Sequence, residues 1–164
     1  AKLPAQDLFV LETIDAPLVD GAVTPPTALR TIAALDVSDA GTRRLELMEK
    51  AQGGIGVLGI NGLTYDESKA SPIMVHLGDT EVWEVANTTG YDHSFHLHGY
   101  SFQPLDSAGQ PWPVREWKDT VLVPAKRSLH LAVRFDDRPG MWMLHCHIID
   151  HVTLGMMAML HVMP

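Results

Sequence analysis

Three kinds of metal-binding side chain are gathered near the end of the chain. Residues 145–157 read HCHIIDHVTLGMM and contain the only cysteine, Cys146. His151 follows this cysteine by five residues and Met156 follows it by ten. A thiolate, an imidazole and a thioether, completed by one more histidine, are the ligands of a blue-copper electron-transfer site. The spacing therefore predicts a copper site built around Cys146.

A second group of histidines is predicted on the opposite face of the same strand. Neighbouring side chains of a strand point to opposite faces, so the two histidines that flank Cys146 point away from its side. Upstream, residues 93–99 read HSFHLHG, in which His96 and His98 share a face, while His93 is offset and can turn toward Cys146. The pattern predicts two sites, one with His93, Cys146, His151 and Met156, and an all-imidazole one with His96, His98, His145 and His147.

Each of these residue types also has an ordinary structural explanation. A lone histidine is more often a surface or core residue than a ligand, and we interpret three isolated ones in that way: His76, His130 and His161. Methionine is a common core filler, so Met156 competes with a packing role and with Met157 as the axial ligand; its spacing from Cys146 favours Met156. The four methionines before Cys146 are predicted to be core residues rather than a copper-gathering patch: Met48, Met74, Met141 and Met143.

The motifs HSFHLHG and HCHIIDHVTLGM resemble the final pair of copper motifs of the multicopper oxidases, the family that includes laccases and bilirubin oxidases. The similarity extends through residues 59–62 and 117–121 to the C-terminus. The resemblance implies a cupredoxin domain in which the first site holds type 1 copper. It also implies type 2 copper at His96 and type 3 copper at three further histidines: His98, His145 and His147.

The same resemblance implies an oxidase. A small reducing substrate such as a phenol would give up single electrons at the type 1 copper, and Cys146 would pass them through its own backbone to His145 and His147. The three-copper cluster would reduce dioxygen to water. A methionine rather than an apolar residue at the axial position implies a comparatively low reduction potential, and hence easily oxidised substrates. A secreted or periplasmic location is expected from the resemblance alone.

Two of the family's four copper motifs are present in this sequence. The family's three-copper cluster takes eight histidines, and the sequence offers four of them. We therefore expect N-terminal cupredoxin domains to supply the others, as a separate chain, a neighbouring subunit or a cleaved segment. The start at Ala1, without a leader, favours a piece of a longer oxidase.

Some positions near the ligands depart from the family pattern. Ser94 stands where many relatives have proline, and Val152 stands where several bacterial relatives have a carboxylate thought to deliver protons to oxygen. Asp150 is a poor substitute if the backbone there is extended, so protons would come from a carboxylate outside this chain. Asp119 is a candidate hydrogen-bond acceptor for a ligand histidine, although a surface or turn-capping role fits it equally well.

Three other functions are compatible with parts of the pattern. A blue electron carrier uses the same spacing of cysteine, histidine and methionine, but it does not need the paired histidines. A zinc-binding or storage module is disfavoured, because one cysteine beside an axial methionine is a poor zinc ligand set. A copper nitrite reductase is disfavoured because its pattern lacks the HCH triplet.

Composition excludes several classes of protein. The 164 residues are enough for one domain with a sizeable core. The formal net charge of −8 and the absence of a basic run argue against a nucleic acid partner. The sequence has no apolar run of the ~20 residues that a membrane-spanning helix needs. A single cysteine excludes an internal disulfide framework.

Alternating apolar and polar residues predict mostly β-strands. The alternation is clearest in residues 127–135, where it leaves His130 on the outer face. Many short strands between turn signals favour a β-sandwich, and the resemblance makes it an all-β, cupredoxin-like Greek-key sandwich with an irregular N-terminal extension. Other strands are predicted at residues 7–14, 42–48, 73–76, 80–86, 94–104, 118–123, 141–148 and 157–162.

The sequence shows no convincing domain boundary. Residues 16–27 contain three prolines and are predicted to form an irregular arm. We expect residues 1–50 to be an N-terminal extension or linker strands of the same domain, and residues 51–164 to be the cupredoxin domain that carries the copper motifs.

Overall fold

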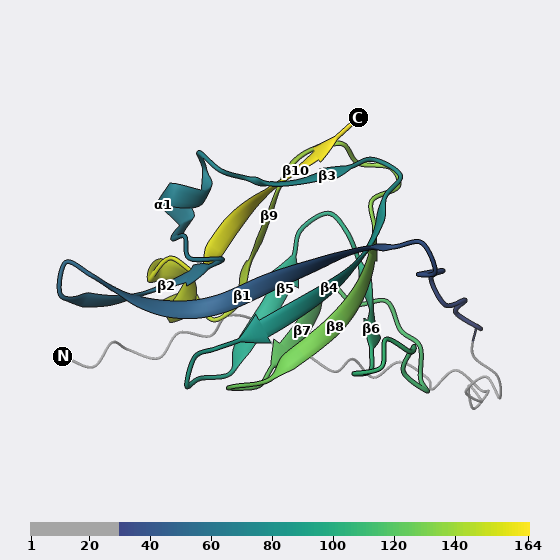
Figure 1. The fold of residues 1–164 in the computed structure, drawn as a ribbon, viewed down its shortest axis with the longest axis horizontal. Helices are drawn as coiled ribbons and strands as arrows, with labels where there is room; N and C mark the ends of the chain where they lie inside the picture. Colours follow the sequence, from purple (N-terminus) through teal and green to yellow (C-terminus); the bar gives the residue numbers. More distant parts are fainter. Residues whose placement is uncertain (1–29) are drawn as a thin grey trace, which may run out of the picture. The chain divides into compact units, whose positions relative to one another are not determined.

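A computed structural model of the chain describes residues 30–164, which fold into two five-stranded sheets and two short helices (Figure 1). The all-β prediction is confirmed. The strand predicted at residues 7–14 and the proline-rich arm at 16–27 lie outside the described residues.

The first sheet has the strand order β2-β1-β4-β8-β6. Strand β1 runs parallel to β4, and the other neighbours in this sheet are antiparallel. A tight turn at Gly53 and Gly54, both at positive φ, connects β1 to β2. The strands are β1 (Gly41–Gln52), β2 (Ile55–Ile60), β4 (Thr80–Asn87), β6 (Phe102–Leu105) and β8 (Ser128–Arg134).

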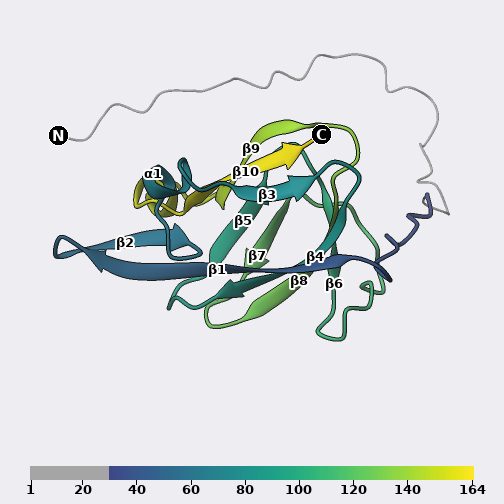
Figure 2. The ribbon, with the colours of Figure 1, turned by 45° about the horizontal axis from the view of Figure 1, so that its top comes forward.

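The second sheet has the strand order β3-β10-β9-β5-β7 and carries both copper motifs. Strand β3 is parallel to β10, and the two lie side by side in Figures 1 and 2. The strands are β3 (Ile73–His76), β5 (His93–Leu97), β7 (Thr120–Val123), β9 (Gly140–Cys146) and β10 (Met157–Met163). The helices are α1 (Tyr65–Ser68) and α2 (Ile149–Thr153).

The hydrophobic core contains large side chains contributed by both sheets. The rings of Trp83 and Phe135 lie 5.8 Å apart between centroids, and Trp83 meets Phe95 of the second sheet edge-on at 6.5 Å. All three are fully buried. On β10 the even-numbered residues are buried and the odd-numbered ones are partly exposed, as expected for a strand with one face on the core. This alternation decides which side chains of the copper motifs turn inward.

One predicted strand, residues 94–104, is wrong as a single element. The structure divides it into β5 and β6, which belong to different sheets. The break begins after Leu97 and contains Gly99, whose φ of +76° is a conformation that glycine adopts without strain. Strand β2 was not predicted, because its glycines interrupt the apolar alternation.

The segment before β1 is attached to the first sheet. The side chain of Gln103, which is buried on β6, accepts a hydrogen bond from the Leu35 amide and donates one to the Ala33 carbonyl. Residues 41–52 form β1 and pair with β4 inside the sandwich. The division of the chain at residues 50 and 51 remains a prediction.

Candidate metal centres

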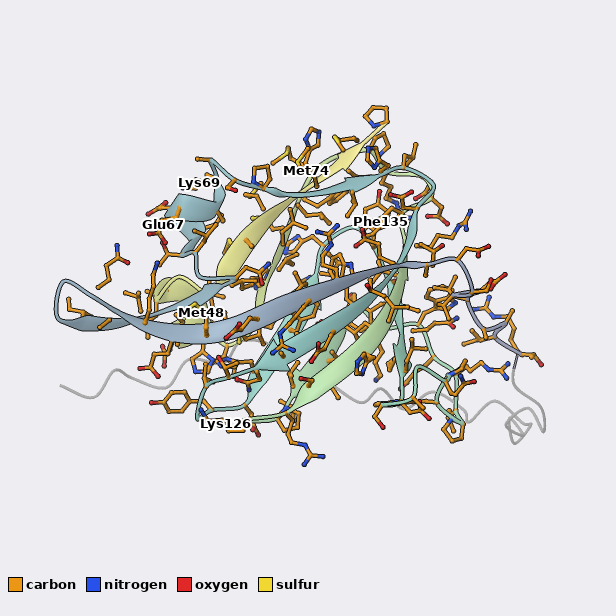
Figure 3. All side chains as sticks on the ribbon, viewed as in Figure 1. Met48, Glu67, Lys69, Met74, Lys126 and Phe135 are labelled. Atoms are coloured by element: carbon orange, nitrogen blue, oxygen red, sulfur yellow. The ribbon has the colours of Figure 1, made fainter. Side chains whose placement is uncertain are left out.

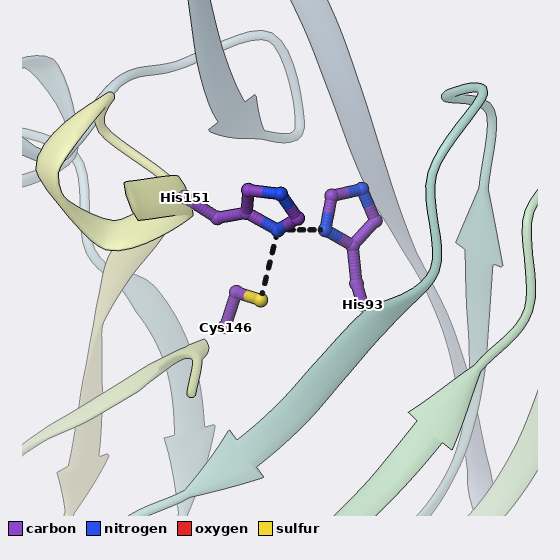
Figure 4. Close-up of side chains that lie close together, drawn as sticks. All are labelled: His93, Cys146 and His151. Carbon is purple, nitrogen blue, oxygen red and sulfur yellow. Dashed lines mark hydrogen bonds between the residues drawn. The ribbon is translucent and has the colours of Figure 1, made fainter. Parts of the chain in front are cut away.

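The first group of ligands contains His93, Cys146 and His151, whose potential ligand atoms all lie within 4.8 Å of one another. The two Nδ1 atoms of the histidines are 2.9 Å apart, and the Cys146 Sγ is 3.4 Å from Nδ1 of His151 (Figure 4). His93 and Cys146 are almost completely buried. One thiol and two imidazoles thus converge on a single point.

Pairing between β5 and β9 brings two of these residues together. Phe95 lies directly opposite Cys146 in the antiparallel ladder, and His93, two residues before Phe95, faces the same side. The burial of β5 alternates so that His93, Phe95 and Leu97 point into the core. The sequence prediction that His93 turns toward Cys146 agrees with this geometry.

Helix α2 and the turn after it bring the other two residues of this group back to Cys146. His151 lies in α2, so the extended backbone assumed for Asp150 is wrong; Asp150 is exposed on this helix. The Met156 amide donates to the His151 carbonyl, and the Cys146 amide donates to the Met156 carbonyl. Met156 is fully buried, whereas Met157 is partly exposed and lies opposite His145 on the outer face. The backbone therefore ties Met156 to both Cys146 and His151.

A buried threonine fixes the tautomer of His93. Nε2 of this ring lies 2.6 Å from the Thr89 hydroxyl oxygen. The single hydroxyl hydrogen is directed to Oδ1 of Asn87 at 2.8 Å or to the Tyr91 carbonyl at 3.2 Å. The hydroxyl oxygen therefore accepts from Nε2–H, and the lone pair of Nδ1 points toward Cys146 and His151. The sequence analysis did not identify Thr89.

Burial sets the charge of this group in the absence of metal. Burial, and after it the nearby His151, lowers the pKa of His93 to about 4, so the ring is a neutral donor at pH 7. Burial also raises the pKa of the Cys146 thiol, partly offset by hydrogen bonds from the backbone of Ile148 and Ser94. A buried thiolate therefore needs a compensating positive charge, which a metal ion bound to the sulfur would supply.

The second group lies on the opposite face of β5 and β9. The potential ligand atoms of His96, His98 and His145 lie within 4.8 Å of one another, and the Nε2 atoms of His98 and His145 are 2.9 Å apart. His96 lies directly opposite His145 in the ladder. Burial is the main cause that lowers the pKa of both His96 and His98, which keeps these rings neutral and able to bind a cation.

Backbone carbonyls fix two of these three rings. Nδ1 of His96 is 3.1 Å from the Asp119 carbonyl, and Nδ1 of His145 is 2.8 Å from the Cys146 carbonyl. A carbonyl oxygen can only accept, so both Nδ1 atoms carry the proton and both Nε2 atoms keep a lone pair that can bind a metal. The predicted role of Asp119 thus falls mainly to its backbone, since its exposed carboxylate is 3.8 Å from the ring. Thr120, 2.8 Å from Nδ1 of His96, was not predicted.

His147 lies beside this group rather than within it. Its ring centroid is 5.3 Å from that of His96 and 5.6 Å from that of His145, and the residue is exposed. Its amide donates to the Ser94 carbonyl at 2.7 Å. The inward group thus contains His93, Cys146 and His151, with Met156 linked to it by backbone hydrogen bonds. The outward group contains His96, His98 and His145, and His147 is exposed beside it.

Several predictions about the other residues need correction. The four methionines expected in the core are not among its buried residues, and Met74 and Met141 are 41% and 50% exposed. The isolated residues His76 and His130 are exposed and partly exposed, as a surface role requires.

The donor atoms at both positions suit copper. A buried thiolate with imidazole and thioether donors is preferred by copper in its two oxidation states, while neutral imidazoles are good ligands for the same metal. Both groups have the ligand nitrogens already oriented by hydrogen bonds, as is usual around protein-bound metals.

Comparison with known proteins agrees with this chemistry. Residues 32–164 match a family model described as multicopper oxidase. A protein named Laccase from Haloferax volcanii is 32% identical over 156 residues, which cover 91% of this chain and 27% of that protein. The multicopper oxidase MmcO of Mycobacterium tuberculosis is 40% identical over 97 residues, which cover 59% of this chain and 18% of that protein.

Solved structures have the same fold. The McoA multicopper oxidase of the hyperthermophile Aquifex aeolicus superimposes with a TM-score of 0.70 and 29% identity, covering 83% of this chain and 32% of that chain. A multicopper oxidase from Campylobacter jejuni, described as a metallo-oxidase, gives a TM-score of 0.70 and 28% identity over 88% of this chain and 34% of that one. The chain thus spans about a third or less of the length of these relatives.

Proposed function

Because the chain belongs to the multicopper oxidase family, we propose that it is the C-terminal cupredoxin domain of a laccase-like oxidase. In this proposal the group at Cys146 takes electrons from a small reducing substrate. The group of histidines at His96 forms part of the cluster that reduces dioxygen.

A single feature carries this proposal, namely the way three consecutive residues join the two ligand groups. Cys146 points inward to His93 and His151, while His145 points to the other face and meets His98. A blue electron carrier would need only the inward group, and no structural role explains an imidazole cluster directly behind the cysteine. The pair of sites therefore favours an oxidase over the carrier.

We assign the ligands as the sequence predicted them. When bound, the coppers would supply one-electron oxidation at the first site and the reduction of dioxygen at the second. Cys146 would hold type 1 copper and connect it to the second site through the backbone of its two neighbours. The assignments are type 1 copper at His93, Cys146, His151 and Met156, type 2 copper at His96, and type 3 copper at His98, His145 and His147.

The residues around the first site keep it dry and preorganised. Thr89 holds the His93 ring with Nδ1 facing the thiol, and the backbone bonds of Met156 close the turn over His151. Because Cys146 and His93 are buried, water has little access to the donor atoms. A site that cannot rearrange favours rapid electron transfer, since the ligands need not move when the charge of the metal changes.

Other domains would complete the second site. His96, His98 and His145 are partly exposed and His147 is exposed, so the histidine group is open on one side. We propose that further cupredoxin domains, in the same or another chain, cover this side and supply the remaining histidines. Val152 offers no carboxylate beside His151, and Asp150 is exposed on α2, so we propose that the protons that dioxygen reduction consumes also come from outside the chain.

The proposal also includes a class of substrate and a location. An axial methionine favours easily oxidised compounds such as substituted phenols. Among the described residues, no helix is long and apolar enough to cross a membrane. A secreted or periplasmic location remains a prediction from the family alone.

Substitution of Cys146 tests the proposal most directly. Cys146→Ser should abolish the intense blue absorption of the copper-loaded protein, because a serine hydroxyl cannot replace the soft thiolate. His130→Gln, which changes an isolated histidine on β8, serves as the control and should leave the colour intact. A blue band that survives in Cys146→Ser would refute the assignment.

Copper content and oxygen uptake separate the oxidase from the carrier. The complete oxidase assembly should hold more than one copper for each copy of this chain and should consume oxygen. The chain alone should bind the blue copper without reducing dioxygen. An assembly that transfers electrons with a single copper for each copy of this chain, and that consumes no oxygen, would favour the electron carrier.

A further inference from the structure

The loop between β4 and β5 leads to His93, and one buried amide, Asn87, holds it from inside. Asn87 is the last residue of β4 and is 3% exposed. Its Nδ2 donates to the Tyr91 carbonyl at 2.7 Å and to the Val123 carbonyl at 3.0 Å. Its Oδ1 accepts from the Thr89 amide at 2.9 Å and from the Thr89 hydroxyl at 2.8 Å. These bonds use both hydrogens and both lone pairs of the amide, so its orientation is fixed.

All of these bonds end at residues that surround His93. Thr89 and Tyr91 belong to the loop just before His93. Val123 lies directly opposite His93 in the ladder between β5 and β7. Since these partners all lie outside β4, capping of that strand does not explain the side chain. Its partners point instead to a role at the first ligand group.

The Thr89 hydroxyl connects Asn87 to the His93 ring. The Tyr91 carbonyl already accepts from Asn87 and is 3.2 Å from the hydroxyl, whereas Oδ1 of Asn87 is 2.8 Å away. The hydroxyl hydrogen therefore points to Oδ1, and the hydroxyl oxygen accepts from Nε2–H of His93 at 2.6 Å. Asn87 thus sets the direction of the hydroxyl, and the hydroxyl sets which nitrogen of His93 faces Cys146.

The Tyr91 carbonyl connects Asn87 to the second imidazole. The centroid of the Tyr91 ring lies 6.2 Å from that of His151, and the His151 ring meets the His93 ring edge-on at 4.6 Å. The Tyr91 side chain is 54% exposed, so burial of its ring does little to hold it. The backbone bond from Asn87 therefore helps to keep this aromatic neighbour beside His151.

Other groups tie the start of the loop to the sandwich. The Lys126 ammonium, at the turn between β7 and β8 (Figure 3), donates to the Thr88 carbonyl. The Thr88 amide and hydroxyl both donate to the Leu47 carbonyl. These contacts do not involve the Asn87 side chain. Loss of that side chain should therefore disturb the ligands more than the attachment of the loop.

We propose that Asn87 is a positioning residue for the metal at the first site, acting on His93 through Thr89 and on His151 through Tyr91. The inference rests on the proposed function, which makes this metal copper. Asn87 acts before the metal binds, because it holds both rings in the arrangement that binding needs. Ligands ordered in advance bind more tightly, since less freedom is lost when the metal arrives.

Asn87→Leu in the copper-free full chain tests the connection to His93. Leucine has nearly the shape of asparagine but can make none of the hydrogen bonds. In ¹⁵N NMR of the histidine rings, the unsubstituted chain should show His93 as a single tautomer protonated at Nε2. The variant should show a mixture of tautomers, because the Thr89 hydroxyl is no longer held toward the ring.

Gln103→Met is the matched control. It also replaces a buried amide by an apolar side chain of similar shape, and Gln103 likewise accepts from one backbone amide and donates to one carbonyl. Its partners, Leu35 and Ala33, lie in the segment before β1. The control should lose stability but keep the single His93 tautomer.

Copper affinity tests the consequence for the site. Titration of Cu(II) against a chelator, followed by the blue absorption, reports on the site at Cys146. Asn87→Leu should weaken this binding at least tenfold, and Gln103→Met should leave it unchanged. In Asn87→Leu/Thr89→Val the fold-loss should be smaller than the product of the two single losses, since both residues act on the same ring in series.

Three results would overturn the inference. The first is a single His93 tautomer with unchanged affinity in folded Asn87→Leu, and the second is equal weakening in Gln103→Met. If Asn87→Leu does not fold, the unsubstituted chain decides. Side-chain amide hydrogens of Asn87 that exchange much more slowly than those of the exposed Gln110, together with one His93 tautomer, support the inference. Equally fast exchange or mixed tautomers would be the third contrary result.

Failure of the proposed function gives a different pattern. An unsubstituted chain that shows no blue absorption with copper would refute the proposed type 1 site. The tautomer of His93 is measured without copper, so it would still decide whether Asn87 orients this ring.

Discussion

The Trp142 indole occupies the space that a side chain on Gly99 would need. A Cβ atom built on Gly99 would lie 2.5 Å from the indole Cε3 atom, and Gly99 itself has a φ of +76°. The indole NH in turn donates to the Arg138 carbonyl at 2.8 Å, which holds the ring in place. Because Gly99 directly follows His98, this contact fixes the end of the strand that carries two ligands.

Gly99→Ala should therefore destabilise the protein by two separate effects. A positive φ costs a residue with a Cβ about 1–2 kcal/mol, and overlap with a packed ring costs about 1–3 kcal/mol. Urea unfolding should show a loss of roughly 2 kcal/mol or more. Gly78→Ala is the matched control, since Gly78 has a φ of +94° and no atom within 4 Å of the added Cβ. Equal losses in both variants would show that the indole contact does not matter.

Thr89→Val should weaken copper at the first site. The substitution removes the hydroxyl that accepts from His93 Nε2–H, so the ring loses the bond that orients Nδ1. Loss of such a partner typically costs ten-fold or more in metal affinity. Competition with a copper chelator measures this. Thr88→Val, whose hydroxyl donates to the Leu47 carbonyl instead, is the control and should retain its affinity.

Met156→Leu should keep the blue colour and raise the reduction potential. A thioether donor stabilises oxidised copper more than reduced copper, so its removal favours the reduced ion. Redox titration of the blue band measures the shift. Met157→Leu changes the neighbouring methionine on the outer face and should leave the potential unchanged; the opposite result would make Met157 the axial ligand.

The stability that Glu67 contributes should depend on pH. Hydrogen bonds from the Lys50 ammonium, the Thr64 amide and the Thr64 hydroxyl lower the pKa of Glu67 to about 2, from an ordinary value of 4.5. A carboxyl whose pKa is lower in the folded protein stabilises it above the ordinary pKa, and this contribution declines as the pH falls toward 2. The gap in unfolding stability between the protein and Glu67→Gln should be full at pH 6 and should shrink between pH 4.5 and pH 3.

Lys50→Met provides the control for this pH effect. It removes the largest cause of the lowered pKa while Glu67 keeps both of its bonds to Thr64, the N-cap of α1. The pH dependence assigned to Glu67 should then be smaller. Urea unfolding of the copper-free chain at each pH makes the comparison, and a gap that is constant from pH 6 to pH 3 would contradict the assignment.

The sequence could predict the strand faces of the ligands because alternation is a local property. The alternation alone predicted that Cys146 and its two flanking histidines point to opposite faces of the strand, and that His93 can turn toward Cys146. The pairing between β5 and β9 was not needed for this. It could not predict that His151 lies in a helix. Residues 149–153 carry no strong helix signal, and they become helical where the chain turns back toward Cys146.

The outward position of three methionines, Met74, Met141 and Met143, was missed for a different reason. They lie on two segments, β3 and β9, on either side of β10, and a methionine pattern within one segment says nothing about the strand that will lie beside it. Met74 is opposite His161 only because β3 is added to the sheet parallel to β10. Such long-range register depends on the whole fold, so the same methionines were assigned to the core.

Thr89 is only four residues before His93, but a threonine near a histidine is too common to be noticed without the turn that joins them.

The position of Cys146 between two outward histidines makes the end of β9 intolerant of insertions and deletions. Side chains alternate with a period of two, so adding or removing one residue before Cys146 would turn the thiol to the surface and bring an imidazole into the core. Both ligand groups would be lost in that single event. The turn at Gly53 and Gly54, by contrast, connects β1 to β2, contains none of the ligands and has open space around both glycines. Length variation and engineered insertions are therefore compatible with that turn, while the spacing from Leu144 to His147 has to stay fixed.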